Sequence, residues 1–285
     1  YLIKRRGLVG DNFTDPKIIE QLKGHTAIGH NRYSTTGAPL IRNIQPFFAD
    51  LHTGGLGIAH NGNLTNAISI REKMVKDGAI FQSTSDTETL VQLIAKSKRT
   101  RTIDKIIDAV FQVQGGYALT IMTNKKLVGI RDPFGIRPLV LGKLKDSYIL
   151  SSETCALDII GAEFIREIEN GEIIVIDKNG TESIKPFPKA QARPCVFEYV
   201  YFSRPDSIVG GKAVHEYRKK LGEELAKENT IDADIVTAVP DSGIPAAIGY
   251  SNQSKITYDM GIIRNHYVGR TFIEPTQQIR QLGVK

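Results

Sequence analysis

The sequence has no tryptophan, only three methionines and two cysteines, and no long apolar run. Two cysteines, Cys155 and Cys195, are too few for a secreted disulfide scaffold and suit the reducing cytosol. A helix that spans a bilayer needs roughly 20 apolar residues in a row, so we expect a soluble protein in the cytoplasm. The chain also lacks a signal peptide and opens on Tyr1 without an initiator methionine, which indicates a fragment or a processed form.

Strong charge of one sign is missing as well. Lys and Arg number 37 against 31 Asp and Glu, a net charge of +6. Such an excess suits anionic ligands such as phosphates and does not require nucleic acid. The basic residues cluster only in KSKRTR, residues 96–101, without interleaved aromatic residues, and we interpret this run as a solvated loop between helices. We expect neither nucleic acid nor a membrane as a partner.

A chain of 285 residues predicts two domains. In the first, short apolar segments between residues 24 and 59 predict strands. Apolar residues at helical spacing then run from Leu64 to Val75, and STSDTETLVQLIAKS opens another helix with Ser85 and Glu88 at the spacing of a capping box. A further helix is predicted around residues 103–110, and strands dominate residues 115–177. Helices segregated from an antiparallel sheet are typical of an α+β domain.

A segment rich in Lys, Pro and small polar residues, 178–194, separates the two regions. We place the boundary after residue 186, which gives domains 1–186 and 187–285. In the second, HEYRKKLGEELAKE predicts a helix, DADIVTAVP a buried strand, PDSG a turn and IPAAIGYSNQSK a helix. This order is the start of a parallel α/β sheet.

The pair Asn61-Gly62 in GIAHNGNLTNA is a strong local signal for a tight turn, here ahead of a helix. Polar groups surround it in the sequence. Arg32 suits a carboxylate, Thr35 adds a hydroxyl and Asp86 suits an ammonium, while Asn61 and Gly62 offer N–H donors for an oxyanion. Taken one at a time, each also fits a plainer role, as a surface charge, a residue favoured by a helix dipole, or a simple turn.

The motifs change this balance because they occur together and in order. The segments GHTAIGHNRYSTTG, NIQPF, GIAHNGNLTN, STSDTE, RDPFGIRPL and SSETCALD resemble the glutaminase domain of glutamine amidotransferases with an N-terminal nucleophile. EYVYFSRPDS and IIRNHYVGRTFIEP extend the resemblance over the whole chain, and the match is to the amidophosphoribosyltransferase family. It implies an α+β glutaminase domain of the N-terminal nucleophile hydrolase type, with αββα layers, followed by the first part of an α/β type I phosphoribosyltransferase domain.

The resemblance also implies roles for the polar residues of the first domain. Arg32, Thr35 and Asp86 would bind glutamine, and Asn61 with Gly62 would form the oxyanion hole. The nucleophile of this family is a cysteine at the mature N-terminus, whose own amine serves as the base. Neither Cys155 nor Cys195 has a free amine beside it. We therefore expect the nucleophile to lie outside this chain, and the chain alone not to hydrolyse glutamine.

In the second domain the resemblance makes PDSG, with Asp241, Ser242 and Gly243, the pyrophosphate loop for phosphoribosyl pyrophosphate. Backbone N–H groups before a helix suit that anion. An ordinary turn in which Asp241 or Ser242 caps the helix is the alternative. IIRNHYVGRTFIEP resembles the flexible loop that closes over this substrate. Phosphoribosyl pyrophosphate contacts are implied for the following residues: Arg264, Tyr267 and Arg270.

The same resemblance implies Mg²⁺ and, in one branch of the family, an iron–sulphur cluster. Mg²⁺ would neutralise the leaving pyrophosphate. Cys195 precedes EYVYFSRPDS, where one branch of the family has an iron–sulphur ligand, and other branches keep a cysteine there without a cluster. A small buried residue is an equal alternative for Cys195.

The predicted function is that of an amidophosphoribosyltransferase of de novo purine synthesis, which converts glutamine and phosphoribosyl pyrophosphate to phosphoribosylamine, glutamate and pyrophosphate. The family's acidic pair and Gly-Thr-rich turn are absent and are expected beyond Lys285. The resemblance further implies a homo-oligomer inhibited by purine nucleotides such as AMP or GMP. The alternatives are a glutaminase attached to another synthase and a catalytically dead binding or regulatory protein.

Overall fold

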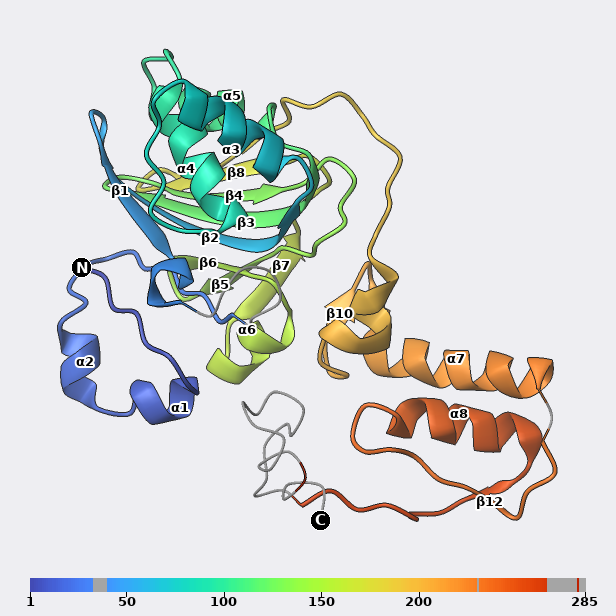
Figure 1. The fold of residues 1–285 in the computed structure, drawn as a ribbon. Helices are drawn as coiled ribbons and strands as arrows, with labels where there is room; N and C mark the ends of the chain where they lie inside the picture. Colours follow the sequence, from blue (N-terminus) through green and yellow to red (C-terminus); the bar gives the residue numbers. More distant parts are fainter. Residues whose placement is uncertain (33–39, 230, 266–280, 282–285) are drawn as a thin grey trace. The chain divides into compact units, whose positions relative to one another are not determined.

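The computed structural model describes residues 1–32, 40–229, 231–265 and 281 (Figure 1). Its contacts divide the chain into two compact units, Tyr1–Cys195 and Val196–Lys285. The sequence suggested a boundary after residue 186 instead. The following segment stays with the first unit because the N–H groups of Arg193 and Cys195 donate to the carbonyls of Phe134 and Ile136, at 2.8 and 3.2 Å. Each unit is described by itself.

An antiparallel six-stranded sheet forms the centre of the first unit, in the order β1-β2-β3-β4-β8-β9. Its middle is the pair β2 and β3, in register from Leu56 opposite Thr123 to Leu64 opposite Gly115. The strands are β1 (Phe47–Leu51), β2 (Gly54–Leu64), β3 (Gly115–Thr123), β4 (Leu127–Arg131), β8 (Ile173–Asp177) and β9 (Gly180–Ile184).

Three helices, α3 (Ala67–Lys76), α4 (Asp86–Lys96) and α5 (Thr102–Val110), cover one face of this sheet (Figure 1). They pack on it through a core in which Ile58, Leu90, Ile106 and Leu119 are each 0% exposed. Burying such a side chain contributes about 1.5–3 kcal/mol relative to leaving it in water. This apolar layer holds the start of α4 against the end of β2.

A second sheet, in the order β6-β5-β7, packs on the opposite face. Ile174 and Ile176 contact it, whereas Ile173 and Val175 face the helices, as expected from the alternation of side chains along a strand. The elements of this layer are β5 (Val140–Leu144), β6 (Ser147–Ser151), β7 (Glu163–Glu167) and α6 (Cys155–Ile160), which packs on β6 and β7. The layers are helices, sheet, sheet and helix, which confirms the predicted αββα architecture.

Ser85 caps α4, as the capping box predicted, because its Oγ accepts the N–H of Thr87 at 3.3 Å. The predicted contact of Glu88 with the backbone N–H of Ser85, the second half of the capping box, is wrong. The Glu88 carboxylate accepts the N–H groups of Gln82 and Ser83, both at 2.7 Å, and does not reach back to Ser85. Glu88 is buried, so its charge needs these donors, and the bend before the helix supplies them.

The strands predicted from residue 24 onward begin only at β1. The described residues before it form short helices and irregular backbone: α1 (Val9–Asn12), α2 (Pro16–Glu20) and the 3₁₀ turn η1 (Ile41–Asn43). A strand needs a neighbour to bond with, and β1 is the edge strand of its sheet. The described residues of 24–46, which exclude 33–39, therefore contribute no strand to the sheet.

The second unit contains a parallel pair of two-residue strands, β12 (Ile235–Val236) and β13 (Thr257–Tyr258), joined through α8 (Ile244–Ser254). This is the βα order that the sequence predicted. The strand itself is not buried: Ile235 is 51% exposed, and among the described residues β12 pairs with β13 alone. The remaining elements are the π-helical turn η2 (Glu198–Phe202), β10 (Ile208–Val209), β11 (Lys212–Ala213) and α7 (Val214–Glu228).

Close approach of α7 and α8 organises this unit. A Cβ at Gly222 of α7 would lie 1.8 Å from the carbonyl oxygen of Ala246, so a residue without a side chain is needed there.

Within the described part of the chain, no helix combines the length and the apolar character needed to cross a membrane.

Candidate functional site

The pair Asn61-Gly62 lies inside β2 and not in a turn. Asn61 is paired with Ala118 and Gly62 with Tyr117 of β3, and the strand ends only at Leu64. The predicted turn is therefore wrong in position, and the chain turns at residues 65–66, before α3. Gly62 has φ of +149°, and a Cβ on it would lie 2.1 Å from the carbonyl oxygen of Gly116. Only glycine lets β2 continue alongside β3 at this point.

Asn61 is held by an arginine far along the chain. Nη2 of Arg137 donates to Oδ1 of Asn61 at 2.7 Å, across 76 residues. Arg137 follows the loop that leads from β4 toward β5. Its own N–H donates to the buried carboxylate of Asp132 at 3.2 Å, and its carbonyl accepts Nε of Arg131 at 3.0 Å. The motif RDPFGIRPL thus folds so that its last arginine reaches the end of β2.

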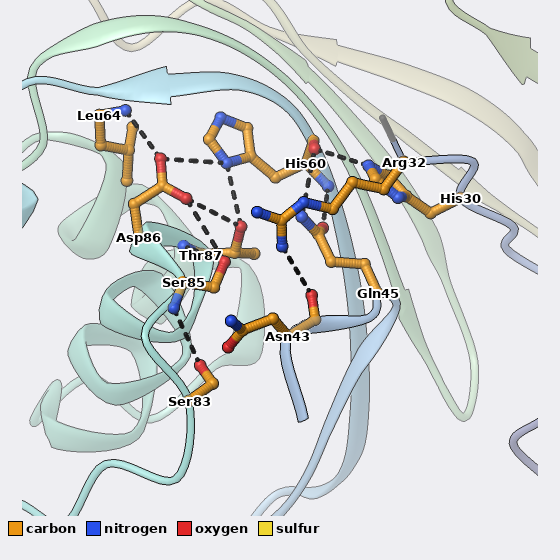
Figure 2. Close-up of polar contacts among 10 residues, drawn as sticks. All are labelled: His30, Arg32, Asn43, Gln45, His60, Leu64, Ser83, Ser85, Asp86 and Thr87. Atoms are coloured by element: carbon orange, nitrogen blue, oxygen red, sulfur yellow. Dashed lines mark hydrogen bonds and ion pairs between the residues drawn. The ribbon is translucent and has the colours of Figure 1, made fainter. Parts of the chain in front are cut away.

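Asp86, the first residue of α4, faces the same end of β2 from the helix layer (Figure 2). Its Oδ2 accepts the N–H of Leu64 at 2.9 Å and lies 3.8 Å from Nδ1 of His60. The side chain keeps 24% of its surface exposed, so the carboxylate can accept a further donor from a ligand. At the N-terminus of a helix its negative charge is also favoured by the helix dipole.

His60 is the buried centre of the polar cluster in Figure 2. Its Nδ1 is 3.1 Å from Oγ1 of Thr87, and its backbone N–H donates to Oε1 of Gln45 at 2.7 Å. The carbonyl of His60 is 3.0 Å from Nε2 of His30. Burial lowers the pKa of His60 to about 4; the charge of Asp86 opposes this shift, and His30 and Arg137 add to it. The imidazole is therefore neutral at pH 7 and orients Asp86 and the strand without adding charge.

Arg32 approaches this cluster from the segment before β1. Its Nη1 donates to the carbonyl of Asn43 at 3.0 Å. The Asn43 side chain in turn joins the segment before α4, because its Nδ2 donates to Oγ1 of Thr84 at 2.8 Å and its Oδ1 accepts the N–H of Thr84 at 2.9 Å. Asn43 therefore links Arg32, which is predicted to bind a carboxylate, to the segment that carries Asp86.

The predicted glutamine-binding residues Arg32 and Asp86 lie on the same side of β2, whereas Asn61 lies on the other. Arg32 and Asp86 are joined through Asn43 and Thr84 on the side of α4. Asn61 points to the other face of the sheet, since the side chain of the preceding His60 contacts α4 and successive residues alternate. Thr35 lies outside the described residues. Arg137 and His60 were not predicted as site residues, although they belong to the motifs RDPFGIRPL and GIAHNGNLTN.

In the second unit, Asp241 and Arg264 are paired with each other, Oδ2 to Nη1 at 2.5 Å, and both remain exposed. The alternative that Asp241 or Ser242 caps α8 is wrong: Gly243 is the N-cap, and α8 has no side-chain cap. Within the loop, the N–H groups of Gly243 and Ile244 donate to the carbonyls of Val239 and Asp241, both at 3.2 Å. Tyr267 and Arg270 lie outside the described residues.

Cys195 is half-buried at the end of the first unit, with its thiol free. Among the residues that the structure describes, no three His, Cys, Asp or Glu side chains gather as metal ligands. An iron–sulphur cluster takes about four cysteines, and the sequence has two. The described residues therefore do not by themselves make up a cluster site.

The chain is similar in sequence to known amidotransferases. The family model of the glutamine amidotransferase domain matches residues 30–158. The amidophosphoribosyltransferase of Rhizobium etli is 56% identical over 100% of this chain, and the match covers 58% of that protein. The chain is a homologue of the amidophosphoribosyltransferases. It spans little more than half the length of these relatives.

Solved structures, one of them of a glutamine phosphoribosylpyrophosphate amidotransferase, have the same fold. One, described as the allosteric regulatory enzyme of purine biosynthesis, matches with a TM-score of 0.90 at 44% identity over 98% of this chain and 60% of that chain. A second, the Bacillus subtilis enzyme complexed with ADP and GMP, matches with a TM-score of 0.81 at 44% identity over 90% of this chain and 56% of that chain. The similarity extends through both units, which does not favour a glutaminase attached to another synthase or a dead binding protein.

Proposed function

We propose that the complete protein containing this chain converts glutamine and phosphoribosyl pyrophosphate to phosphoribosylamine, glutamate and pyrophosphate, the reaction of an amidophosphoribosyltransferase in purine synthesis. The observation that carries this proposal is the 56% identity over the whole chain, through both compact units. Because the chain spans 58% of that relative, the proposal concerns the complete protein and every assay uses it.

Glutamine is bound through its amino-acid end. Arg32 binds the α-carboxylate, Thr35 adds a hydroxyl donor and Asp86 binds the ammonium. The 24% of the Asp86 side chain that remains exposed supports this role. A carboxylate and a guanidinium at the two ends recognise the zwitterion, and charge-assisted hydrogen bonds of this kind are stronger than neutral ones.

The amide end of glutamine meets Asn61 and Gly62. A thiolate attacks the side-chain carbonyl carbon, the C=O electrons move onto oxygen, and the N–H donors of Asn61 and Gly62 stabilise that oxyanion. The N-terminal amine passes the proton taken from the thiol to the nitrogen, so that collapse releases ammonia, and water then hydrolyses the thioester to glutamate. Neither cysteine present supplies this thiolate: the Cys155 thiol is buried and donates to Glu153 at 3.7 Å, and Cys195 lies at the boundary of the units. We propose that the nucleophile is an N-terminal cysteine outside this chain.

Ammonia displaces pyrophosphate from C1 of phosphoribosyl pyrophosphate in the second unit. The loop of Asp241, Ser242 and Gly243 binds the pyrophosphate group, and Arg264, with Tyr267 and Arg270, contacts the same substrate. Bound together with this substrate, Mg²⁺ would supply positive charge to the leaving pyrophosphate. One exposed carboxylate, Asp241, fits a metal that is held mostly by phosphate oxygens and water.

Regulation and assembly follow the relatives. The related structures described as an allosteric enzyme of purine biosynthesis and as a complex with ADP and GMP support inhibition by purine nucleotides. We further propose a homo-oligomer in the cytoplasm, without nucleic acid as a partner. Cys195 as an iron–sulphur ligand stays a prediction, to be checked by the visible absorption of the purified complete protein.

The function is tested by measuring phosphoribosylamine formation with glutamine and with added ammonia. The Asn61→Ala variant should lose at least about tenfold of the glutamine-dependent rate, since an oxyanion donor is worth roughly 10²–10³ in kcat. The ammonia-dependent rate should survive. Failure of the wild-type protein to form product from either nitrogen source would refute the proposed function, and equal loss of both rates would remove Asn61 from the oxyanion role.

A further inference from the structure

Among the residues that the structure describes, the side chain of Asn61 has one hydrogen-bond partner, and this partner is charged. Nη2 of Arg137 donates to its Oδ1 at 2.7 Å. An asparagine amide carries one oxygen that only accepts and one nitrogen that only donates. A guanidinium beside the amide favours the oxygen on its side and repels the NH₂ group. Arg137 therefore selects one of the two orientations of the Asn61 amide.

Arg137 is itself held by a buried network. The Asp132 carboxylate, 0% exposed, accepts the N–H groups of Phe134, Ile136 and Arg137 at 3.0, 3.1 and 3.2 Å. The guanidinium of Arg131, 7% exposed, donates to the carbonyl of Arg137 at 3.0 Å. The Asp132 carboxylate and the Arg131 guanidinium therefore both stabilise the conformation of this loop through hydrogen bonds.

The same carboxylate ties this loop to the strand opposite Gly62. Asp132 donates its backbone N–H to the carbonyl of Tyr117 at 2.9 Å and accepts the Tyr117 N–H on Oδ2 at 3.3 Å. Tyr117 is the register partner of Gly62 in the β2 and β3 pair. The position of Arg137 is therefore fixed relative to both residues assigned to the oxyanion hole.

We propose that Arg137 is a positioning residue of the glutaminase reaction, which locks the Asn61 amide with its oxygen turned to the guanidinium and its NH₂ turned to the oxyanion. This proposal rests on the proposed function and adds a residue to it. Without the arginine, the amide turns over, and in half of its orientations an acceptor faces the negative oxygen. The positive charge of Arg137 also lies behind the donor and polarises it. The substrate class is the side-chain amide of an amino acid.

The experiment compares Arg137→Met, Arg137→Lys and Asn61→Ala, alone and combined, in the complete protein. Arg137→Met should lower kcat for glutamine about tenfold, part of the roughly 10²–10³ that an oxyanion donor provides, with the KM for glutamine changed less than about twofold. Arg137→Lys, which can still donate to Oδ1, should recover most of that loss. In the Asn61→Ala background Arg137→Met should have no further effect, because its target is gone.

Ammonia-dependent synthesis is the internal control, since it needs a folded protein but no oxyanion hole, and it should stay at the wild-type rate in every variant. Arg101→Met is the matched control, because Arg101 is an exposed arginine paired with Asp104, and it should leave both rates unchanged. The proposal is overturned by a raised KM at unchanged kcat, by equal losses in both backgrounds, or by loss of the ammonia-dependent rate with the glutamine-dependent one. A wild-type protein that forms no phosphoribosylamine from either nitrogen source would instead refute the proposed function.

Discussion

Gly62 and Gly116 approach so closely across β2 and β3 that a Cβ on Gly62 would lie 2.1 Å from the carbonyl oxygen of Gly116. Real Cβ atoms do not come that near to an oxygen, so any substitution forces the two strands apart. The strand pairing and the N–H of Gly62 would be displaced together. A site for an oxyanion is thus built on a contact that also holds the sheet.

Gly62→Ala is expected to destabilise the first unit by about 3 kcal/mol or more, through overpacking and a φ that alanine rarely adopts. Urea unfolding followed by far-ultraviolet circular dichroism measures this. Gly10→Ala is the matched control, because nothing lies within 4 Å of its Cβ position, and its midpoint should barely move. Equal midpoints for the two variants would mean that the strands separate without cost.

The stability of the first unit should depend on pH through His60. Burial lowers the pKa of His60 from 6.5 to about 4, so between these values the unfolded chain binds a proton that the folded one does not. The resulting stability is present above pH 6.5 and is lost as the pH falls toward 4, by about 3 kcal/mol.

Denaturant titrations of wild type and His60→Gln between pH 7 and 4 test this dependence. The variant should show a flatter slope of unfolding free energy against pH, whatever its stability at pH 7. His52→Gln is the control, since His52 is exposed at the turn between β1 and β2, and its slope should equal that of wild type. A wild-type slope in His60→Gln would assign the pH dependence to other groups.

Asp86→Asn tests recognition of the glutamine ammonium. The change removes the charge but keeps an oxygen for the N–H of Leu64, which the carboxylate accepts at 2.9 Å. We expect the KM for glutamine to rise by about tenfold or more, which corresponds to about 1.4 kcal/mol of lost binding. The ammonia-dependent rate should be unchanged. Asp50→Asn, at an exposed position of β1, should leave the KM as it is, and an unaltered KM in Asp86→Asn would end this assignment.

Gly222→Ala should weaken the second unit. The added Cβ would lie 1.8 Å from the carbonyl oxygen of Ala246, so α7 and α8 must separate, at a cost of about 1–3 kcal/mol or more. Leu225→Ala on the same helix is the control, since Leu225 is 51% exposed. Limited proteolysis should cleave the Gly222→Ala protein faster between α7 and α8, and equal cleavage rates would show that the helices tolerate the methyl group.

Local pattern predicted much of this fold. Apolar residues at helical spacing predicted α4, α7 and α8, and Ser85 was correctly identified as a cap, because these features depend on neighbours three or four residues apart. The failures involve partners farther away. Glu88 bonds to Gln82 and Ser83 in place of Ser85 because of the bend before the helix. Ile235 lies exposed because, in the part of the chain that the structure describes, its strand has β13 as its single neighbour.

The sequence by itself determined the order of helices and strands, the family resemblance, and the residue types able to bind glutamine. The tertiary structure alone decided that β2 runs on through Asn61 and Gly62, since only pairing with β3 overrides the local preference of Asn-Gly for a turn. It also decided that Arg137 meets Asn61 across 76 residues. Periodicity reports which face of an element is buried, but not which distant element covers it, because that depends on how the layers pack.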